Sequence, residues 1–284
     1  MRSSLRRFTV ATLTAIGLVA APLAASAQAD PVAAAKKYAS PGADLVGANN
    51  WSCRPTATHP EPVVLVHGTF VPGAINFALL APRLKSLGYC VFSIDYGGPI
   101  GTGPMAESAK QLKVFVDGVL AATGAAKVSI VGHSQGGALP RWYLRFLGGT
   151  AKTSRLIGMA PTNHGTEFPL AGQVGFVCPA CADQAVGSKF NRTLDAGHDV
   201  EPGVAYTVIQ TKFDQVNFPY TNQALAGPAD QVTNRIIQDD CAWRPVEHAL
   251  QAVDGVTRQY VEKALAVPNG PLPKDFKPNC GVLL

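Results

Sequence analysis

Charged residues are scarce in this chain, and the two signs nearly cancel. They make up 15% of its 284 residues, with 24 basic and 19 acidic side chains. Without the basic residues of the first seven positions, the formal charge falls to about +2. So small an excess excludes the strongly basic surface that nucleic-acid binding requires, and we expect no nucleic-acid partner.

Internal repeats, low-complexity segments and metal-binding spacings are also lacking. The carboxylates do not follow the pattern of a calcium-binding loop, and the cysteines and histidines do not follow that of a zinc finger. We therefore expect no metal and no organic cofactor. The length of residues 30–284 favours one large domain over two.

The one long apolar run lies at the N-terminus and is too short for a membrane anchor. Residues 10–25 are almost all apolar or small, whereas a spanning helix needs about 20 apolar residues. Basic residues precede the run, and small-residue cleavage sites follow it near residues 27 and 29. We predict that residues 1–29 are a signal peptide and that the protein is secreted and extracellular. A pair of arginines would also suit twin-arginine export, but its flanking sequence favours general secretion.

Six cysteines in a secreted chain favour three disulfides, and spacing alone leaves their pairing open. Cys178 and Cys181 form a C-P-A-C sequence, which is also found in redox and metal pairs. Here the pair lies in an irregular segment rich in glycine and proline. We therefore interpret it as a local structural disulfide.

Short apolar segments typical of strands alternate with segments of helical spacing. The predicted strands are residues 63–66, 90–96, 128–131, 156–159 and 204–210, and the predicted helices are residues 77–87, 105–122 and 256–266. This alternation predicts an α/β fold, with a mostly parallel sheet and helices on both faces. Residues 165–203 interrupt it, either as a cap over a pocket or as an ordinary excursion that completes the core.

The sequence V-S-I-V-G-H-S-Q-G-G places Ser134 on a G-x-S-x-G turn directly after an apolar strand. Gly132 and Gly136 provide the small residues that a sharp turn from strand to helix needs. Such a turn exposes the serine hydroxyl and directs the first helical amides at the same point. Ser134 is the predicted nucleophile, and a plain turn capped by serine is the alternative.

A serine nucleophile needs a base, and six histidines are available. His248 lies between the last predicted strand and the final helix, where a loop can reach over Ser134, so it is the predicted base. A solvated histidine at a helix start is the alternative. His133 adjoins the nucleophile but should point away across the turn. The others lie before the fold, beside the loop after the first strand, or around the insertion: His59, His67, His164 and His198.

An orienting carboxylate is expected between serine and histidine in the chain. Asp214 follows the strand predicted at residues 204–210 and suits this role. Asp239 and Asp240 are nearer to His248 in sequence, but they precede Cys241 in a segment more easily explained as a disulfide-anchored loop.

The negatively charged oxygen of a reacting carbonyl needs N–H donors. The amide of Gln135, directly after the nucleophile, should provide one, and Thr69, after the first predicted strand, should provide the other. If the Thr69 hydroxyl also points inward, this residue would donate twice.

With these residues the chain resembles the secreted bacterial class 2 lipases and esterases, a family of α/β-hydrolases, and more distantly the fungal lipase B type. The matching segments are W-S-C, V-V-L-V-H-G-T-F, G-Y-C-V-F, G-H-S-Q-G-G, C-P-A-C, T-K-F-D and V-E-H. The resemblance implies Ser134, Asp214 and His248 as a catalytic triad, with Thr69 and Gln135 as oxyanion donors. It also implies the disulfides Cys53–Cys90, Cys178–Cys181 and Cys241–Cys280, whereas residues 165–203 match no lid of the family.

We therefore expect a secreted serine hydrolase that cleaves carboxylic esters with apolar acyl chains through an acyl-enzyme. Its partners would be a lipid or ester substrate and, transiently, a lipid interface, and we expect a monomer. Acyl transfer to an alcohol by the same triad is one alternative. A non-catalytic α/β-hydrolase that binds lipid or a partner protein is the other.

Overall fold

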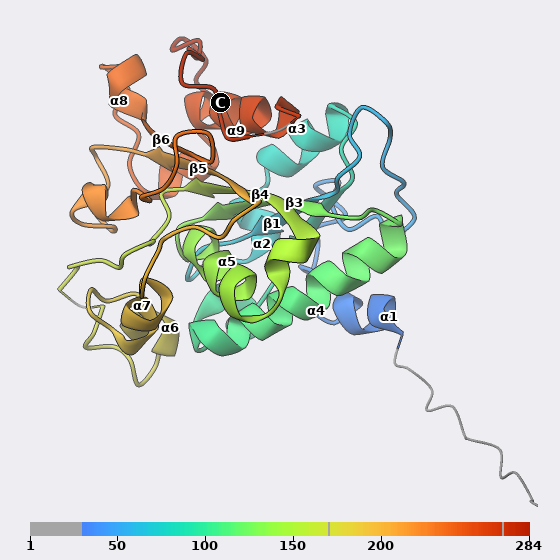
Figure 1. Cartoon of the computed structure of the whole chain (residues 1–284), viewed down its shortest axis with the longest axis horizontal. Coiled ribbons are helices and arrows are strands. Elements are labelled where there is room, and N and C mark those ends of the chain that lie inside the picture. The colour runs from blue at the N-terminus through green and yellow to red at the C-terminus, as the bar shows by residue number, and fades with distance from the viewer. Residues whose placement is uncertain (1–29, 170, 269) are drawn as a thin grey trace, which may run out of the picture.

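The computed structural model describes residues 30–169, 171–268 and 270–284 (Figure 1). The signal peptide predicted for residues 1–29 lies outside the described residues. At the centre is a six-stranded sheet of strand order β2-β1-β3-β4-β5-β6, in which every neighbouring pair is parallel. The strands are β1 (Val63–Val66), β2 (Val91–Ile94), β3 (Val128–His133), β4 (Thr153–Met159), β5 (Ala205–Gln210) and β6 (Val232–Ile236).

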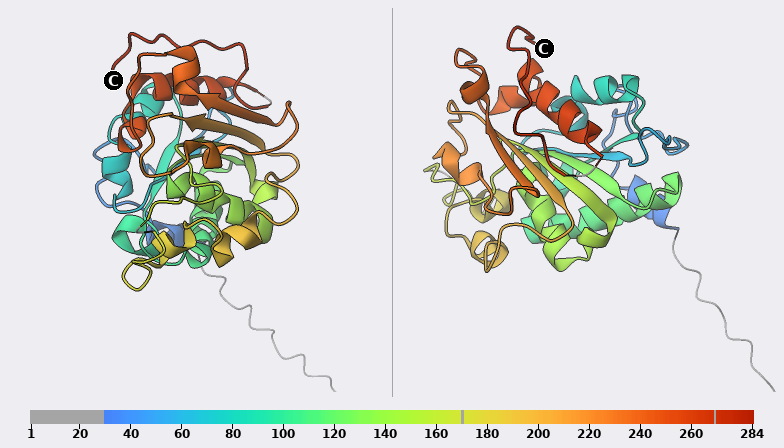
Figure 2. Two further views of the ribbon diagram at one scale, coloured as in Figure 1. Left: turned by 90° about the vertical axis from the view of Figure 1, so that its left-hand side faces the viewer. Right: turned by 45° about the horizontal axis from the view of Figure 1, so that its top comes forward.

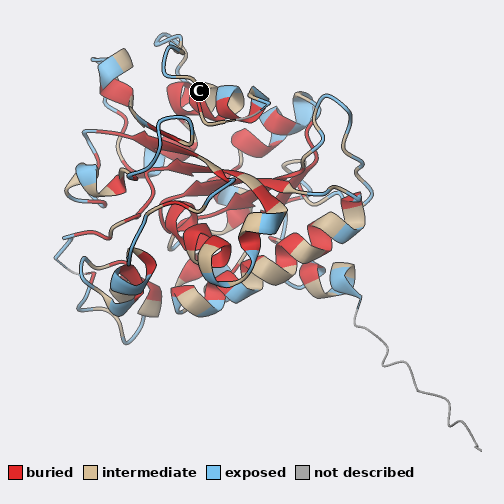
Figure 3. Ribbon diagram, viewed as in Figure 1, coloured by how far each residue is buried: buried red, intermediate tan, exposed pale blue. Residues whose placement is uncertain are grey.

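Helices pack on both faces of the sheet and form two apolar layers (Figures 1 and 2). Successive side chains of a strand point to opposite faces. In β1, Val64 and Val66 therefore join the layer under α1, α4 and α5, and Val63 and Leu65 join the layer under α3 and α9. All four are fully buried, as expected of a parallel sheet covered on both sides. The central strands are mostly coloured as buried in Figure 3. These helices are α1 (Pro31–Lys36), α4 (Met105–Thr123), α5 (Gln135–Phe146), α3 (Leu80–Ser86) and α9 (Gly255–Ala266).

The helix before β2 and the last strand of the sheet differ from the sequence prediction. The helix predicted at residues 77–87 is shorter and follows a separate turn of helix, so that α2 (Gly73–Asn76) precedes α3. Strand β6 was not predicted, because the edge strand V-T-N-R-I lacks an apolar run and exposes Asn234. The remaining short helices are α6 (Pro179–Asp183), α7 (Lys189–Leu194) and α8 (Ile237–Asp240), with 3-10 turns at Gly149–Lys152, Tyr220–Gln223 and Ala249–Ala252 and a π turn at Gly97–Gly101.

Three disulfides tie peripheral segments to this framework. Cys53–Cys90 joins the N-terminal segment to the start of β2, and Cys178–Cys181 closes the first turn of α6. Cys241–Cys280 ties the C-terminal tail to the segment that leads to His248. These are the pairs that the resemblance implies. Among the described residues, no helix combines the length and the apolar character needed to cross a membrane.

Candidate active site

Ser134 lies on a strained turn between β3 and α5. Its backbone has φ 57° and ψ −124°, a conformation that L-residues rarely adopt. A side chain at Gly132 would overlap the carbonyl group of Gly136, and one at Gly136 would overlap the carbonyl oxygen of Val66. The turn can therefore close only because both positions are glycine, as the G-x-S-x-G pattern predicts.

The structure brings Ser134 and His248 together, although they are 114 residues apart in the chain. His248 precedes the 3-10 turn Ala249–Ala252, and its Nε2 lies 2.9 Å from Ser134 Oγ. On the other side of the imidazole, Nδ1 lies 2.8 Å from Oδ2 of Asp214. All three side chains are buried. In this order, serine, histidine and carboxylate form a continuous hydrogen-bonded chain.

Asp214 is held rigidly by three donors in addition to His248. Its Oδ1 accepts from the backbone amides of Val216 and Asn217, at 2.9 and 2.7 Å. Its Oδ2 also accepts from Nε2 of Gln223, at 2.9 Å. The carboxylate is thus oriented toward the imidazole from a tight turn after β5. Gln223 carries no sequence motif, and sequence reasoning missed it.

The two rival carboxylates have other partners. Asp239 is exposed and pairs with Lys212 at 2.7 Å. The side chain of Asp240 is buried. It accepts a hydrogen bond from the hydroxyl of Tyr260 at 2.6 Å and pairs with Lys277. Both aspartates therefore belong to ion pairs at the end of α8, the helix that follows β6.

Thr69 and Gln135, the predicted oxyanion donors, lie side by side next to Ser134. The Thr69 hydroxyl donates to Oε1 of Gln135 at 2.6 Å, so its proton points toward the Gln135 side chain. It accepts in turn from Nε2 of Gln184 at 3.0 Å. Gln184 follows α6 in the 165–203 insertion, so the insertion contacts the loop of Thr69, the proposed oxyanion loop, directly. Sequence reasoning did not identify this residue, since neither spacing nor motif marks it.

A cavity of about 430 Å³ opens on Ser134 and His248. Of the described residues that line it, half come from the insertion: Thr166, Phe168, Ala171, Val174, Cys181 and Gln184. The insertion also buries Phe190 and Leu194 of α7 in the core. Residues 165–203 thus form one wall of the cavity and also complete the core. The insertion has features of both predicted alternatives, the cap over a pocket and the excursion that completes the core.

A comparison with protein families bears on this arrangement. The model of the family described as Lipase (class 2) matches residues 60–259, which include Ser134, Asp214 and His248. The chain belongs to the class 2 lipase family.

Two curated proteins resemble part of this chain, and two solved structures share its fold. Triacylglycerol lipases of Pseudarthrobacter phenanthrenivorans and Burkholderia plantarii are each 39% identical over 89 residues. The match covers 28% of this lipase family member and only 27% and 24% of those proteins. Lipase B of Aspergillus fumigatus aligns with TM-score 0.67 and 20% identity, over 78% of this chain and 57% of that one. A gene product of Listeria innocua aligns with TM-score 0.52 and 13% identity, over 77% and 96%. The predicted α/β-hydrolase fold and family are confirmed.

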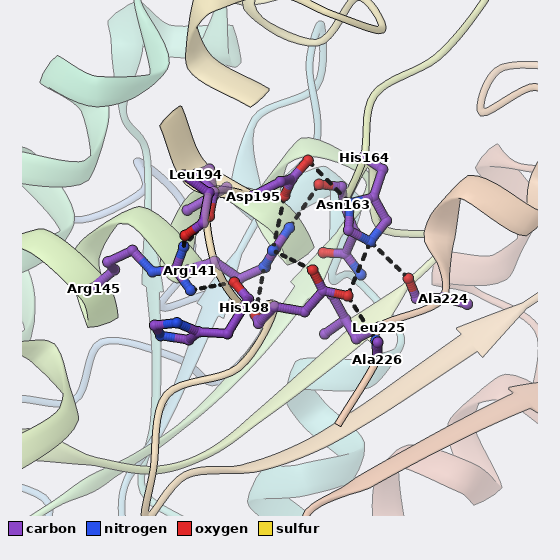
Figure 4. A network of polar contacts seen from close by, with 12 residues as sticks. Arg141, Arg145, Asn163, His164, Leu194, Asp195, His198, Ala224, Leu225 and Ala226 are labelled. Carbon is purple, nitrogen blue, oxygen red and sulfur yellow. Dashed lines mark hydrogen bonds and ion pairs between the residues drawn. The ribbon is translucent and has the colours of Figure 1, made fainter. Parts of the chain in front are cut away.

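A network of ion pairs links residues at the two ends of the insertion (Figure 4). His164 directly precedes the insertion, and Asp195 and Asp199 lie near its end. The imidazole places Nδ1 3.0 Å from Asp195 and Nε2 3.4 Å from Asp199. Arg141 of α5, whose side chain is buried, donates to Asp195 at 3.0 Å. The network joins the two ends of the insertion to the helix that follows Ser134.

His164, Asp195 and Asp199 also lie close enough together to ligate a metal ion, with their ligand atoms within 4.8 Å of one another. The guanidinium of Arg141, however, already contacts both carboxylates, at 3.0 and 3.8 Å. Two cations therefore face two anions if His164 is protonated. We interpret the cluster as a charge-balanced ion-pair network.

We expect this network to stabilise the protein at neutral pH and to lose part of that contribution at alkaline pH. Partial burial disfavours a charged imidazole, but the bonds to Asp195 and Asp199 outweigh it and raise the pKa of His164 from 6.5 to about 9. A raised pKa stabilises the fold fully below pH 6.5, and this contribution is lost as the pH rises through about 9. Thermal unfolding from pH 6 to 10 should show Tm falling across this window, and less so in His164→Gln. Parallel Tm curves for the two proteins would contradict the assignment.

Proposed function

We propose that this protein is a secreted serine hydrolase that cleaves carboxylic esters with apolar acyl chains through an acyl-enzyme. The observation that carries the proposal is the buried chain from Ser134 Oγ through His248 to Asp214, at the floor of a largely apolar cavity. The names of the triacylglycerol lipase relatives support the ester substrate. The three disulfides support an oxidising compartment and thus secretion.

In the proposed reaction His248 Nε2 removes the proton of Ser134 as Oγ attacks the ester carbonyl carbon. The same nitrogen then donates this proton to the alcohol oxygen as the ester bond breaks. The alcohol leaves, and the acyl group remains bound to Ser134 Oγ. His248 Nε2 then takes a proton from water as its oxygen attacks the acyl carbon. The bond from this carbon to Ser134 Oγ breaks, His248 returns the proton to Oγ, and the acid is released. Asp214 keeps the Nδ1 proton in place and stabilises the imidazolium that forms in each half.

The negative oxygen of both tetrahedral intermediates would be stabilised by the backbone amides of Gln135 and Thr69. A donor of this kind is worth about 3 kcal/mol of transition-state stabilisation. Both residues flank Ser134, and Thr69 lines the cavity. The Thr69 hydroxyl would contribute only if it turned from Gln135 Oε1 toward the substrate, with Gln184 Nε2 still donating to it.

The mouth of the cavity is apolar and favours contact with a lipid surface. Phe70, Phe168 and Val216 line the cavity and are also exposed to solvent. Phe176 is 88% exposed, two residues after the cavity residue Val174. Large exposed aromatic side chains around one opening are typical of a surface that binds an apolar partner.

Hydrolysis of nitrophenyl esters from acetate to palmitate, below and above their solubility, tests the proposal. We expect turnover that favours the longer apolar chains, because the cavity walls can bury them. A rate that rises once droplets form would support lipase action at an interface, and a preference for short soluble esters would mean an open esterase pocket. Absence of turnover at every chain length would favour a lipid-binding protein.

Two surface variants separate interface contact from catalysis in the same assay. Phe176→Ser should weaken activity on droplets while leaving activity on dissolved esters unchanged. Trp243→Ser is the matched control, because Trp243 is 96% exposed but lines a different hollow, beside Cys280. Equal activity of both variants on droplets would exclude Phe176 from the interface.

A further inference from the structure

Behind the serine turn, a second chain of hydrogen bonds joins the oxyanion loop to the segment that carries His248. The amide of Gly68, directly before Thr69, donates to Asn76 Oδ1 at 2.9 Å. Nδ2 of Asn76 lies 3.1 Å from Nδ1 of His133, the last residue of β3. His133 Nε2 lies 3.0 Å from the backbone carbonyl oxygen of His248.

Both ends of this chain are backbone groups with fixed chemistry, so its direction is fixed as well. The Gly68 N–H can only donate, which assigns Oδ1 of Asn76 as its acceptor and turns Nδ2 toward His133. The carbonyl of His248 can only accept, so His133 carries its proton on Nε2 and accepts at Nδ1. Burial and the neighbouring His248 lower the pKa of His133 to about 3, which keeps the imidazole neutral.

The two ends matter because each adjoins a reacting group. Gly68 packs tightly behind the nucleophile: an added side chain there would lie 3.1 Å from Ser134 Cβ and 3.3 Å from His133 Nδ1. Its amide position therefore sets where the next residue, Thr69, presents its own N–H. At the other end, the carbonyl of His248 belongs to the residue whose imidazole contacts Ser134.

We propose that Asn76 and His133 are positioning residues that hold the oxyanion loop and His248 at fixed places around Ser134. The inference rests on the proposed function and adds two residues to its site. Neither side chain lines the cavity, so each acts through the backbone groups that it binds. Both are buried, at 5% exposed each, and the chain is shielded from water. Shifts of about 1 Å in such groups can cost about 100-fold in rate.

Two substitutions at one position separate the two ends of the chain. In His133→Asn the amide group occupies the place of Nδ1, so the contact with Asn76 is kept and the bond to His248 is lost. In His133→Gln the amide reaches the place of Nε2, so the bond to His248 is kept and Asn76 loses its acceptor. Asn76→Ser removes the link to Gly68 without changing His133.

We expect each variant to lower kcat for a soluble nitrophenyl ester by about 10- to 100-fold, with KM within about threefold. Because the bonds act as one chain, Asn76→Ser combined with His133→Gln should be about as slow as the slower single variant. A purely structural role would instead lower Tm and leave kcat per phosphonate-titrated active site unchanged. If His133→Asn does not fold, Asn76→Ser and His133→Gln decide by the same measurements.

Parent-like kcat in folded His133→Gln and Asn76→Ser would overturn the inference, as would independent effects that multiply in the double variant. The parent enzyme and Ser134→Ala serve as references. A parent without Ser134-dependent turnover would overturn the proposed function and the inference with it, whereas an active parent with equally active variants would overturn the inference alone.

Discussion

Replacing Ser134 by alanine should lower kcat for ester hydrolysis by about 10⁶-fold, close to the background rate of the assay. The substitution removes the single oxygen that would form the acyl bond. His248 keeps its contact with Asp214, but its Nε2 then has no hydroxyl to deprotonate. The proposed oxyanion donors remain in place and should account for whatever activity is left.

The folded structure should survive this change. Ser134 makes its backbone turn through Gly132 and Gly136, and its own amide donates to the carbonyl oxygen of Met159, which alanine retains. Tm should therefore shift by only a few degrees, and mass spectrometry after exposure to a serine-directed phosphonate should show labelling of the parent alone. Ser86→Ala on α3 is the matched control, since its exposed hydroxyl donates to the carbonyl of Arg83 and to no other group of the described residues.

Comparable hydrolysis by Ser134→Ala and the parent would contradict the assignment of the nucleophile. Loss of activity in both Ser134→Ala and Ser86→Ala, with a lowered Tm, would instead indicate damage to the fold. Labelling of Ser134 without turnover would leave a reactive serine that transfers or retains the acyl group. The three results are distinguishable with one ester, one phosphonate and one melting curve.

The central fold was predictable because its signals are local. Buried parallel strands are short β-branched runs, and β1 and β3 each read as such a run directly before a turn. The turn at Ser134 needs glycine at positions 132 and 136, so residues 132–136 alone indicate it. Strand β6 escaped prediction because it lies at the edge of the sheet, where polar residues such as Asn234 are accommodated.

The supporting residues of the site could not be predicted in the same way. Gln184, Gln223 and Asn76 contact the site from segments that only the tertiary fold brings there. An isolated amide side chain has no spacing or composition that distinguishes it from a solvated one. The direction of the Thr69 hydroxyl likewise depends on Gln184, which is 115 residues away. Sequence therefore indicated the groups proposed to react, and the structure was needed to find the groups that orient them.

Exchanging Asp214 for asparagine should lower kcat by about 10⁴-fold while nearly preserving the shape of the site. The carboxylate accepts hydrogen bonds from His248 Nδ1 and from three further donors. An amide at this position can instead donate to Nδ1, which would move the imidazole proton to Nε2. His248 could then no longer accept the proton of Ser134. Because the loss is one of proton position, KM should change far less than kcat.

The two rival aspartates provide the controls for this prediction. Asp239→Asn removes an exposed ion pair with Lys212, and such pairs contribute little, so kcat and Tm should stay near the parent values. Asp240→Asn weakens a buried contact with Tyr260, so Tm should fall while kcat per titrated active site remains unchanged. If Asp240→Asn or Asp239→Asn lost activity and Asp214→Asn did not, the orienting carboxylate would lie nearer to His248 in the sequence. The hydrogen bonds argue for the opposite result, because Asp214 contacts the imidazole of His248, whereas Asp239 pairs with Lys212 and Asp240 with Tyr260.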